Sequence, residues 1–150
     1  RKRSDRESPA ESELLDRGYI VFERYESRKS VFIQFSTLKY RFMATFGSET
    51  EKIFSDTNKT LNSIFIAARL LATHYWPRQG RVHMTEQEFE KHLDDMNKHE
   101  GVFWDMLNDE DEIRSKLETI QNELEKITKP CFEETMRSYT MFTKRLNKNG

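Results

Sequence analysis

The sequence has one cysteine, three prolines and five glycines in 150 residues. Cys131 has no second cysteine to pair with, so no internal disulfide can form, and the cysteine usage fits a reducing, cytoplasmic setting. The few glycines and prolines supply too little turn chemistry for a β-sandwich or β-barrel, and they form no glycine-rich loop of the kind that holds phosphate. These absences favour an all-α protein.

The sequence also has no apolar run near the roughly 20 residues that a membrane-spanning helix needs. Its first residue is arginine rather than methionine, and a basic opening of this kind is typical of the cytoplasmic flank of a transmembrane helix. We therefore expect residues 1–8 to be a flexible basic flank, with Arg1, Lys2 and Arg3 following an upstream transmembrane segment that this sequence does not include. The alternative interpretation is a basic tail without a membrane segment.

Net charge is also nearly absent, at −1, so no overall field attracts a polyanion and a nucleic-acid partner is not expected. The charges are unevenly distributed. Residues 1–46 hold ten Lys/Arg against seven Asp/Glu, and residues 86–112 hold two against eleven. An acidic block of this kind is typical of a solvated helix face that follows an acidic helix start.

Four predicted helix starts carry side chains that can cap free backbone N–H groups. Three have the spacing of a capping box, in which a Ser or Thr side chain and a Glu three residues later cap each other's backbone. Gly47 precedes one of them and suits a left-handed position after a helix. The capping boxes are Ser8–Glu11, Ser48–Glu51 and Thr85–Glu88, and the fourth start is Asn108 or Asp109.

Apolar residues recur at steps of three and four and predict four long helices. Short connections make consecutive helices antiparallel, which gives an elongated up-down helical bundle, a single domain over residues 9–147. A break at Ser27–Ser30 stays open, although one helix to Phe46 is preferred, and Pro130 gives either a kinked helix or a fifth helix. The predicted helices are Pro9–Phe46, Glu49–Trp76, Glu86–Leu107 and a last one from Asn108 or Asp109 to Leu146.

Arg69 and His74 form the most enzyme-like pattern in the chain, Arg69-Leu70-Leu71-Ala72-Thr73-His74. This segment resembles the Arg-x4-His core of HEPN ribonucleases, which are all-α domains of similar size. The resemblance covers six residues, and it implies metal-independent RNA cleavage in which Arg69 and His74 act on the RNA backbone, in that family usually at a dimer interface. A guanidinium can hold phosphate and an imidazole can move a proton near neutral pH. The alternative is a structural or partner-contact role for both residues.

A second candidate site is a polar stripe on the third predicted helix. Glu88, His92, Asp95 and His99 follow one another at steps of four, three and four, which places them on one helix face. Imidazole and carboxylate groups on one stripe can ligate zinc or iron, so a metal-binding helical bundle is an alternative function. An exposed polar stripe beside the apolar one is the simpler interpretation, and we expect no metal or other cofactor.

None of these patterns names a reaction. The preferred hypothesis is therefore an uncharacterised cytoplasmic helical domain, close to a membrane, that acts through protein–protein contacts without catalysis. Because long amphipathic helices in a short chain leave apolar flanks to share, we expect a protein partner or self-association into an oligomer.

Overall fold

The computed structural model describes residues 1–79, 83–104 and 111–146, with side chains up to residue 139. The predicted all-α class is confirmed, since these residues form helices and no strand. None of the described helices combines the length and the apolar character needed to cross a membrane. The elements in chain order are α1 (Pro9–Ser27), α2 (Lys29–Phe46), the 3₁₀ turn η1 (Ser48–Thr50), α3 (Glu51–Leu70), the π-helical turn η2 (Leu71–Tyr75), α4 (Trp76–Arg78), α5 (Glu86–Phe103) and α6 (Glu112–Leu146).

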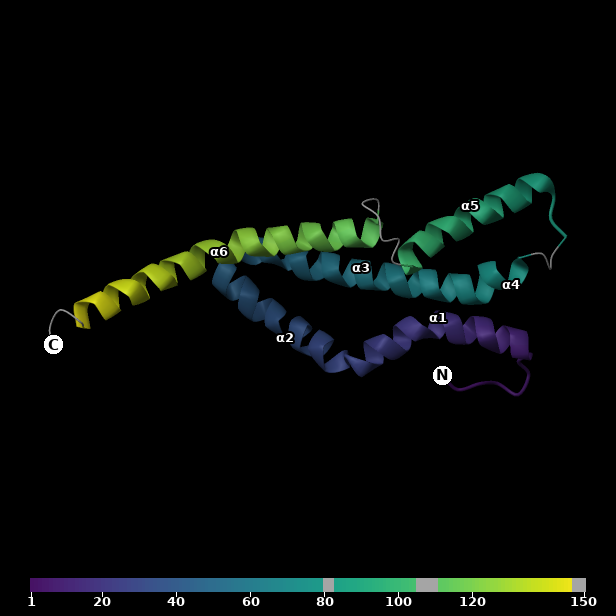
Figure 1. Cartoon of the computed structure of the whole chain (residues 1–150), viewed down its shortest axis with the longest axis horizontal. Helices are drawn as coiled ribbons and strands as arrows, with labels where there is room; N and C mark the ends of the chain where they lie inside the picture. Colours follow the sequence, from purple (N-terminus) through teal and green to yellow (C-terminus); the bar gives the residue numbers. More distant parts are fainter. Residues whose placement is uncertain (80–82, 105–110, 147–150) are drawn as a thin grey trace.

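Helix α3 is the central element of an elongated molecule (Figure 1). Helices α1 and α2 run along one side of it, and α3, η2 and α4 run back in the opposite direction. Helix α5 then reverses the direction again, and α6 continues in the same direction as α5. All four other long helices contact α3. The predicted up-down bundle of four long helices is therefore not confirmed, because α6 follows α5 instead of turning back beside it.

The first predicted helix is broken, so the preferred single helix from Pro9 to Phe46 is wrong. Arg28 adopts φ −119° and ψ 12°, and its N–H donates to the carbonyl oxygen of Tyr25 at 3.0 Å. The break keeps aromatic side chains from both helices against α3. The ring centroid of Tyr25 lies 4.7 Å from that of Phe32 in α2 and 5.2 Å from that of Phe65 in α3.

The turn between α2 and α3 depends on Gly47, which has φ +102° and ψ 159°. Its φ is positive, as predicted for a left-handed position, but its ψ lies outside the left-handed helical region. The predicted capping box at Ser48–Glu51 is not formed. The chain makes the η1 turn there instead, in which the Thr50 hydroxyl donates to the Gly47 carbonyl oxygen at 2.7 Å. The capping boxes at Ser8–Glu11 and Thr85–Glu88 are both present, as predicted.

The second predicted helix continues beyond Trp76, through Pro77 to Arg78. Its last part contains the wide π-helical turn η2, in which the Trp76 N–H donates to the Leu71 carbonyl oxygen. A proline inside an α-helix has no N–H to donate and clashes with the carbonyl group four residues earlier. The wide turn directly before Pro77 changes the backbone at that point, so the proline does not end the helix.

Pro130 does not divide the last helix, since α6 is continuous from Glu112 to Leu146 and bends along its length in Figure 1. Of the two alternatives at Pro130, the described residues form the single continuous helix and not a separate fifth one. The Asp111 carboxylate accepts from the Arg114 N–H at 2.8 Å at the start of α6. The predicted helix starts Asn108 and Asp109, and the predicted helix end Leu107, lie outside the described residues.

The main core lies where α1, η2, α4 and α5 meet, around Leu71, Ala72, Trp76 and Met96. Gly18 of α1 allows the close approach there. A Cβ atom added at Gly18 would lie 2.5 Å from the Ala72 Cβ and 2.8 Å from the Ala68 carbonyl oxygen. At the other end of α3, Ile53 and Phe54 are buried, and the ring of Phe54 packs against those of Phe35 and Phe42.

Candidate functional site

The Arg69–His74 pair spans the wide turn of the central helix. Arg69 is exposed on the last turn of α3, and His74 is half-buried in η2. In a regular α-helix, side chains five residues apart point about 140° apart. The i→i+5 hydrogen bonding of a π-helical turn reduces this angle, because each turn then contains more residues. The turn therefore brings Arg69 and His74 closer to one face than an α-helix would.

Arg78 is a cationic neighbour of His74 on the same helix. The Nε2 atom of His74 lies 3.3 Å from a guanidinium nitrogen of Arg78, and its ring lies edge-on to Tyr75 with centroids 4.9 Å apart. Burial, the charge of Arg78 and the nearby His92 together hold the pKa of His74 below its ordinary value. A neutral imidazole can accept a proton, and the Arg78 guanidinium beside it can hold an anion.

Tyr75 lies between three histidines, a cluster that the sequence analysis did not identify. Besides His74, its ring contacts His92 at 5.4 Å and His99 at 5.1 Å between centroids, both from α5. His92 and His99 are seven residues apart, which is two helical turns, so both reach the same facing residue. This spacing is the signal from which the contact could have been predicted.

The four predicted metal ligands are divided among other interactions. Glu88 completes the capping box with Thr85, and Asp95 pairs with Lys98 at 3.5 Å. His92 and His99 pack on Tyr75, and the buried Nε2 atom of His92 has no hydrogen-bond partner within the described part of the chain. Across residues 1–79, 83–104 and 111–146, no group of three or more His, Cys, Asp or Glu is placed to hold a metal ion.

Trp76 and Glu100 form a polar contact beside this cluster. The indole N–H of the buried Trp76 donates to a Glu100 carboxylate oxygen at 2.7 Å. The guanidinium of Arg17 in α1 lies over the indole ring, 5.4 Å from its centroid. These interactions hold α4 between α1 and α5, so they position the cluster and need no ligand to explain them.

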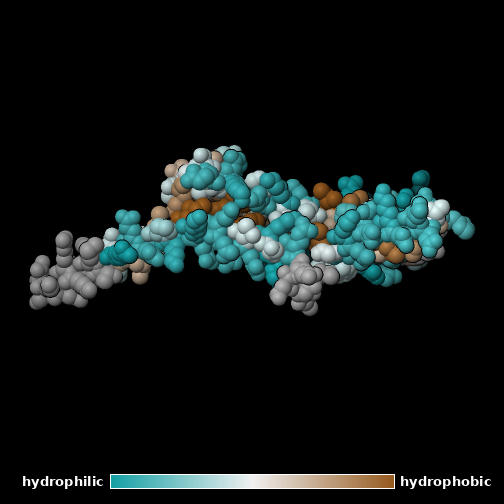
Figure 2. All heavy atoms as spheres, turned by 90° about the horizontal axis from the view of Figure 1, so that it is seen from above, coloured by the Kyte–Doolittle hydropathy of each residue, from teal (hydrophilic) through white to brown (hydrophobic). Residues whose placement is uncertain are grey.

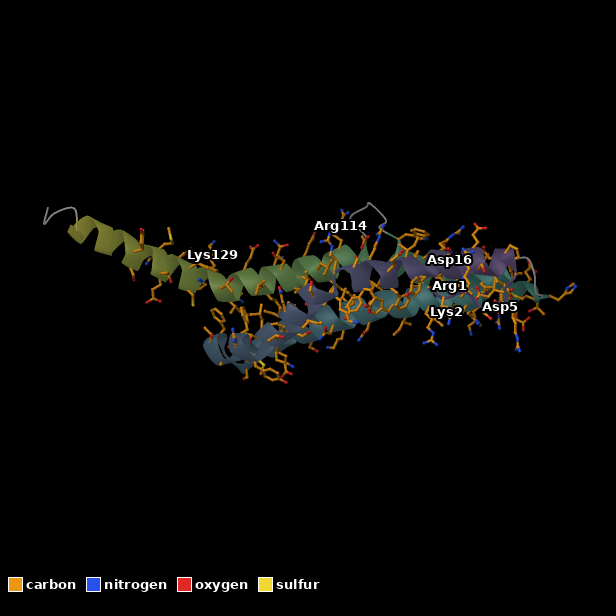
Figure 3. All side chains as sticks on the ribbon, turned by 90° about the horizontal axis from the view of Figure 1, so that it is seen from below. Arg1, Lys2, Asp5, Asp16, Arg114 and Lys129 are labelled. Carbon is orange, nitrogen blue, oxygen red and sulfur yellow. The ribbon has the colours of Figure 1, made fainter. Side chains whose placement is uncertain are left out.

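The basic opening of the chain is held against α1 (Figure 3). The Arg1 guanidinium donates to the carboxylates of Glu7 and Asp16 at 2.8 Å, and Arg3 donates to Asp16 at 2.6 Å. The hydrogen bond from Arg1 is the main cause that lowers the pKa of Glu7, and the one from Arg3 is the main cause for Asp16. Two of the three positive charges in Arg1–Arg3 are therefore already paired with carboxylates.

Most of the exposed large apolar side chains in the described part of the chain lie on two helices. Helix α2 contains no buried residue and exposes Val31, Ile33, Leu38 and Tyr40. Helix α6 exposes Phe132, Met136 and Tyr139 in its second half. In Figures 1 and 3, α6 extends beyond Lys129 past the ends of α2 and α3, with no other described helix beside it.

Comparison with known proteins finds no protein that is similar to this chain. No family model matches the chain, and no curated protein and no solved structure is similar to it. The geometry above is therefore the basis for a functional proposal.

Proposed function

We propose that this chain is a non-enzymatic helical interaction domain that associates with protein chains, including further copies of itself. The observation that carries this proposal is the amount of surface that the single chain leaves exposed. Its accessible surface is 12005 Å² for a mass of 18.0 kDa. A compact monomer of this mass exposes about 8,000 Å², so roughly 4,000 Å² is in excess.

The excess surface includes apolar side chains that a monomer usually buries. The face shown in Figure 2, on the side of α5 and α6, is mostly hydrophilic with separate hydrophobic patches. Further apolar side chains project from α2 and from the second half of α6. Large exposed apolar patches mark contact sites in soluble proteins. A stable interface buries about 1,200–2,000 Å² in total, so the excess on one chain is large enough to form one.

Sedimentation equilibrium over a wide range of protein concentration tests the proposal. We expect the average mass to rise above that of one chain as concentration increases. Hydrogen exchange measured at low and high concentration then shows which amides become protected. A mass that stays at one chain, together with the absence of binding to any other protein, would contradict the proposal.

We further propose that the domain works in the cytoplasm close to a membrane, as its basic opening indicates. The ion pairs of Arg1 and Arg3 with Glu7 and Asp16 limit how much positive charge this opening presents to an anionic surface. Membrane fractionation of cells that produce the full-length protein tests the location. Recovery of the protein only in the soluble fraction would contradict it.

A second candidate function is metal-independent RNA cleavage by Arg69 and His74. The specific observation in its favour is the π-helical turn between them, since such turns occur frequently at functional sites. Arg78 beside the imidazole adds a second group able to hold a phosphate. In this mechanism, neutral His74 accepts a proton from the 2′-hydroxyl as its oxygen bonds to phosphorus, and Arg69 stabilises the charge on the phosphate. The P–O5′ bond breaks, the leaving 5′-oxygen takes a proton from water, and the products are a 2′,3′-cyclic phosphate and a 5′-hydroxyl.

The chain supplies a matched control for this activity. Arg78 and His83 have the same spacing as Arg69 and His74, and His83 is exposed. We expect His74→Ala to abolish cleavage of a single-stranded RNA and His83→Ala to leave the rate unchanged. Equal rates for wild type and His74→Ala would exclude the ribonuclease mechanism.

A further inference from the structure

An apolar hollow of about 430 Å³ lies at the break between α1 and α2. Its lining is almost entirely apolar, and the rings of Tyr25, Phe32 and Phe65 pack together there. Arg24 and Arg28 stand at its edge, and its lining contains no carboxylate. The apolar residues of the lining are Val21, Tyr25, Val31, Phe32, Leu61, Ile64 and Phe65.

A second hollow of about 430 Å³ adjoins the first. Both are lined by Val21, Arg24 and Ile64, and the second continues to Trp104 at the end of α5 and Leu117 in α6. The two hollows form one groove along α3, with α1 on one side and the first turns of α6 on the other. We call it the α1–α6 groove.

The α1–α6 groove is lined by residues of α1, α2 and α3, the end of α5 and the start of α6. This chain's own α6 does not fill it, because α6 is continuous through Pro130 and extends away from the groove (Figure 1). Helices in bundles pack side by side at 8–10 Å, so the apolar lining is matched to an amphipathic helix. The charged residues along the groove are of both signs, Arg24, Arg28 and Arg114 against Asp111 and Glu118, which suits a helix that carries both charges beside its apolar row.

The second half of α6 has these properties. Phe132, Met136 and Tyr139 are 64–68% exposed, and their spacing of four and three places them on one face. The segment carries charges of both signs, Glu133 and Glu134 together with Arg137, Lys144 and Arg145. The segment from Pro130 to Leu146 is about 25 Å long, enough to lie along the groove.

We propose that the second half of α6 from one copy lies in the α1–α6 groove of a second copy, and that the exchange is reciprocal. This inference rests on the proposed self-association and names its contact surfaces. The occupant is a second copy because the required helix is present, exposed and extended away from its own groove. The excess surface of roughly 4,000 Å² per chain exceeds the 600–1,000 Å² per partner that a stable dimer of standard size buries.

Two charge-introducing variants test the two sides of the contact separately. Val31→Glu places a carboxylate in the groove, and Phe132→Glu places one on the exposed row of α6. Each should weaken dimerisation at least tenfold in sedimentation velocity experiments. Ile66→Glu is the matched control, since Ile66 is as exposed as Val31, at 57%, and does not line the groove. Circular dichroism confirms folding, and Phe132→Ala is a milder second variant.

Mixing the two variants distinguishes exchange from a symmetric face-to-face contact. Val31→Glu and Phe132→Glu chains together retain one intact groove and one intact helix that fit each other. We therefore expect the mixture to form a heterodimer more strongly than either variant forms a homodimer. A mixture no stronger than the homodimers would overturn the reciprocal exchange.

Cys131, the natural cysteine beside Phe132, allows a direct measurement of proximity. A chain with Cys131→Ser and Arg28→Cys, mixed with wild type, should form a disulfide between its groove and Cys131 of the wild-type chain. A chain with Cys131→Ser and Glu90→Cys, which places the new cysteine at an exposed position on α5, should form no disulfide with the wild type. If Val31→Glu and Phe132→Glu leave the dimerisation affinity unchanged and no such disulfide forms, this inference is overturned but self-association stands. A chain that stays monomeric at every concentration overturns both.

Discussion

Gly18 of α1 lies so close to Ala72 of η2 that a Cβ on the glycine would be 2.5 Å from the Cβ of the alanine. The carbonyl oxygen of Ala68 would lie 2.8 Å from the same added atom, and a backbone atom in a packed helix has little freedom to move away. The contact between α1 and the central helix therefore depends on the absence of a side chain at position 18.

Gly18→Val should destabilise the fold, because the new side chain must separate α1 from α3 and η2. Overpacking of this kind costs about 1–3 kcal/mol. Gly18→Ala should also destabilise, although alanine favours a helix. Gly101 is the control, since nothing lies within 4 Å of a Cβ added there. Gly101→Ala should raise the free energy of unfolding by about 0.5–1 kcal/mol in urea titrations, the usual effect of replacing glycine in a helix.

Gly47 gives a second glycine prediction, based on backbone conformation. Its φ of +102° with ψ of 159° falls in a region that is essentially restricted to glycine. Gly47→Ala and Gly47→Asn should each lower the free energy of unfolding by about 1–3 kcal/mol. Asparagine tolerates the left-handed helical region but not this one, so it should give no rescue. A clear gain for Gly47→Asn over Gly47→Ala in thermal unfolding would show that the turn is left-handed helical instead.

The hydrogen bond between Trp76 and Glu100 should contribute measurably to stability. Glu100→Ala leaves a buried indole N–H without its acceptor, which costs about 1–3 kcal/mol. In a double-mutant cycle with Trp76→Phe, we expect a coupling energy of about 1.5–3 kcal/mol, the range for a hydrogen bond to a charged group. Glu90→Ala on the exposed face of α5 should change stability by less than about 0.5 kcal/mol. Additive effects of Glu100→Ala and Trp76→Phe in urea titrations would show that the contact contributes nothing.

Stability should fall in mildly acidic solution because of His74. Its pKa in the folded chain is lowered from 6.5, first by burial and then by the charges of Arg78 and His92. The unfolded chain therefore binds a proton at a higher pH than the folded chain does. The stabilisation is fully present above pH 6.5 and is lost as pH falls through the lowered folded pKa.

The measurement for His74 is the free energy of unfolding from pH 8 to pH 5, for wild type and His74→Gln. Subtracting the two profiles removes the contributions of the other titrating groups. The wild type should lose more stability than His74→Gln over this range, and Arg78→Gln should show an intermediate loss. Parallel profiles for wild type and His74→Gln would contradict the assignment.

The helical class and the helix starts at Ser8 and Thr85 could be predicted because they depend on local chemistry. The capping boxes at Ser8 and Thr85 use atoms three residues apart, so the sequence alone contains the whole interaction. The break at Arg28 could not be placed in the same way. It depends on the packing of Tyr25 and Phe32 against Phe65, which is distant in the sequence.

The candidate site was predicted only in part, for the same reason. His92 and His99 share a helix face, as their spacing predicted, but the residue that they contact is Tyr75 of another element. The direction of α6 was not predictable either, because a short connection between two helices allows them to lie side by side or to continue in one direction. The α1–α6 groove is a consequence of that direction.

The wide turn at Leu71–Tyr75 also has a consequence for how the sequence can vary. A π-helical turn contains one residue more than an α-helix would need over the same hydrogen-bonded stretch. A homologue that lacks one residue here should form a continuous α-helix in which Trp76 keeps nearly the same direction relative to α3, because four α-helical residues turn the chain about as far as five residues of the wider turn. The indole would still reach Glu100, and α5 would keep its anchor. A one-residue deletion between positions 71 and 75 is therefore expected to be tolerated better than one within α3, which would rotate everything after it by about 100°.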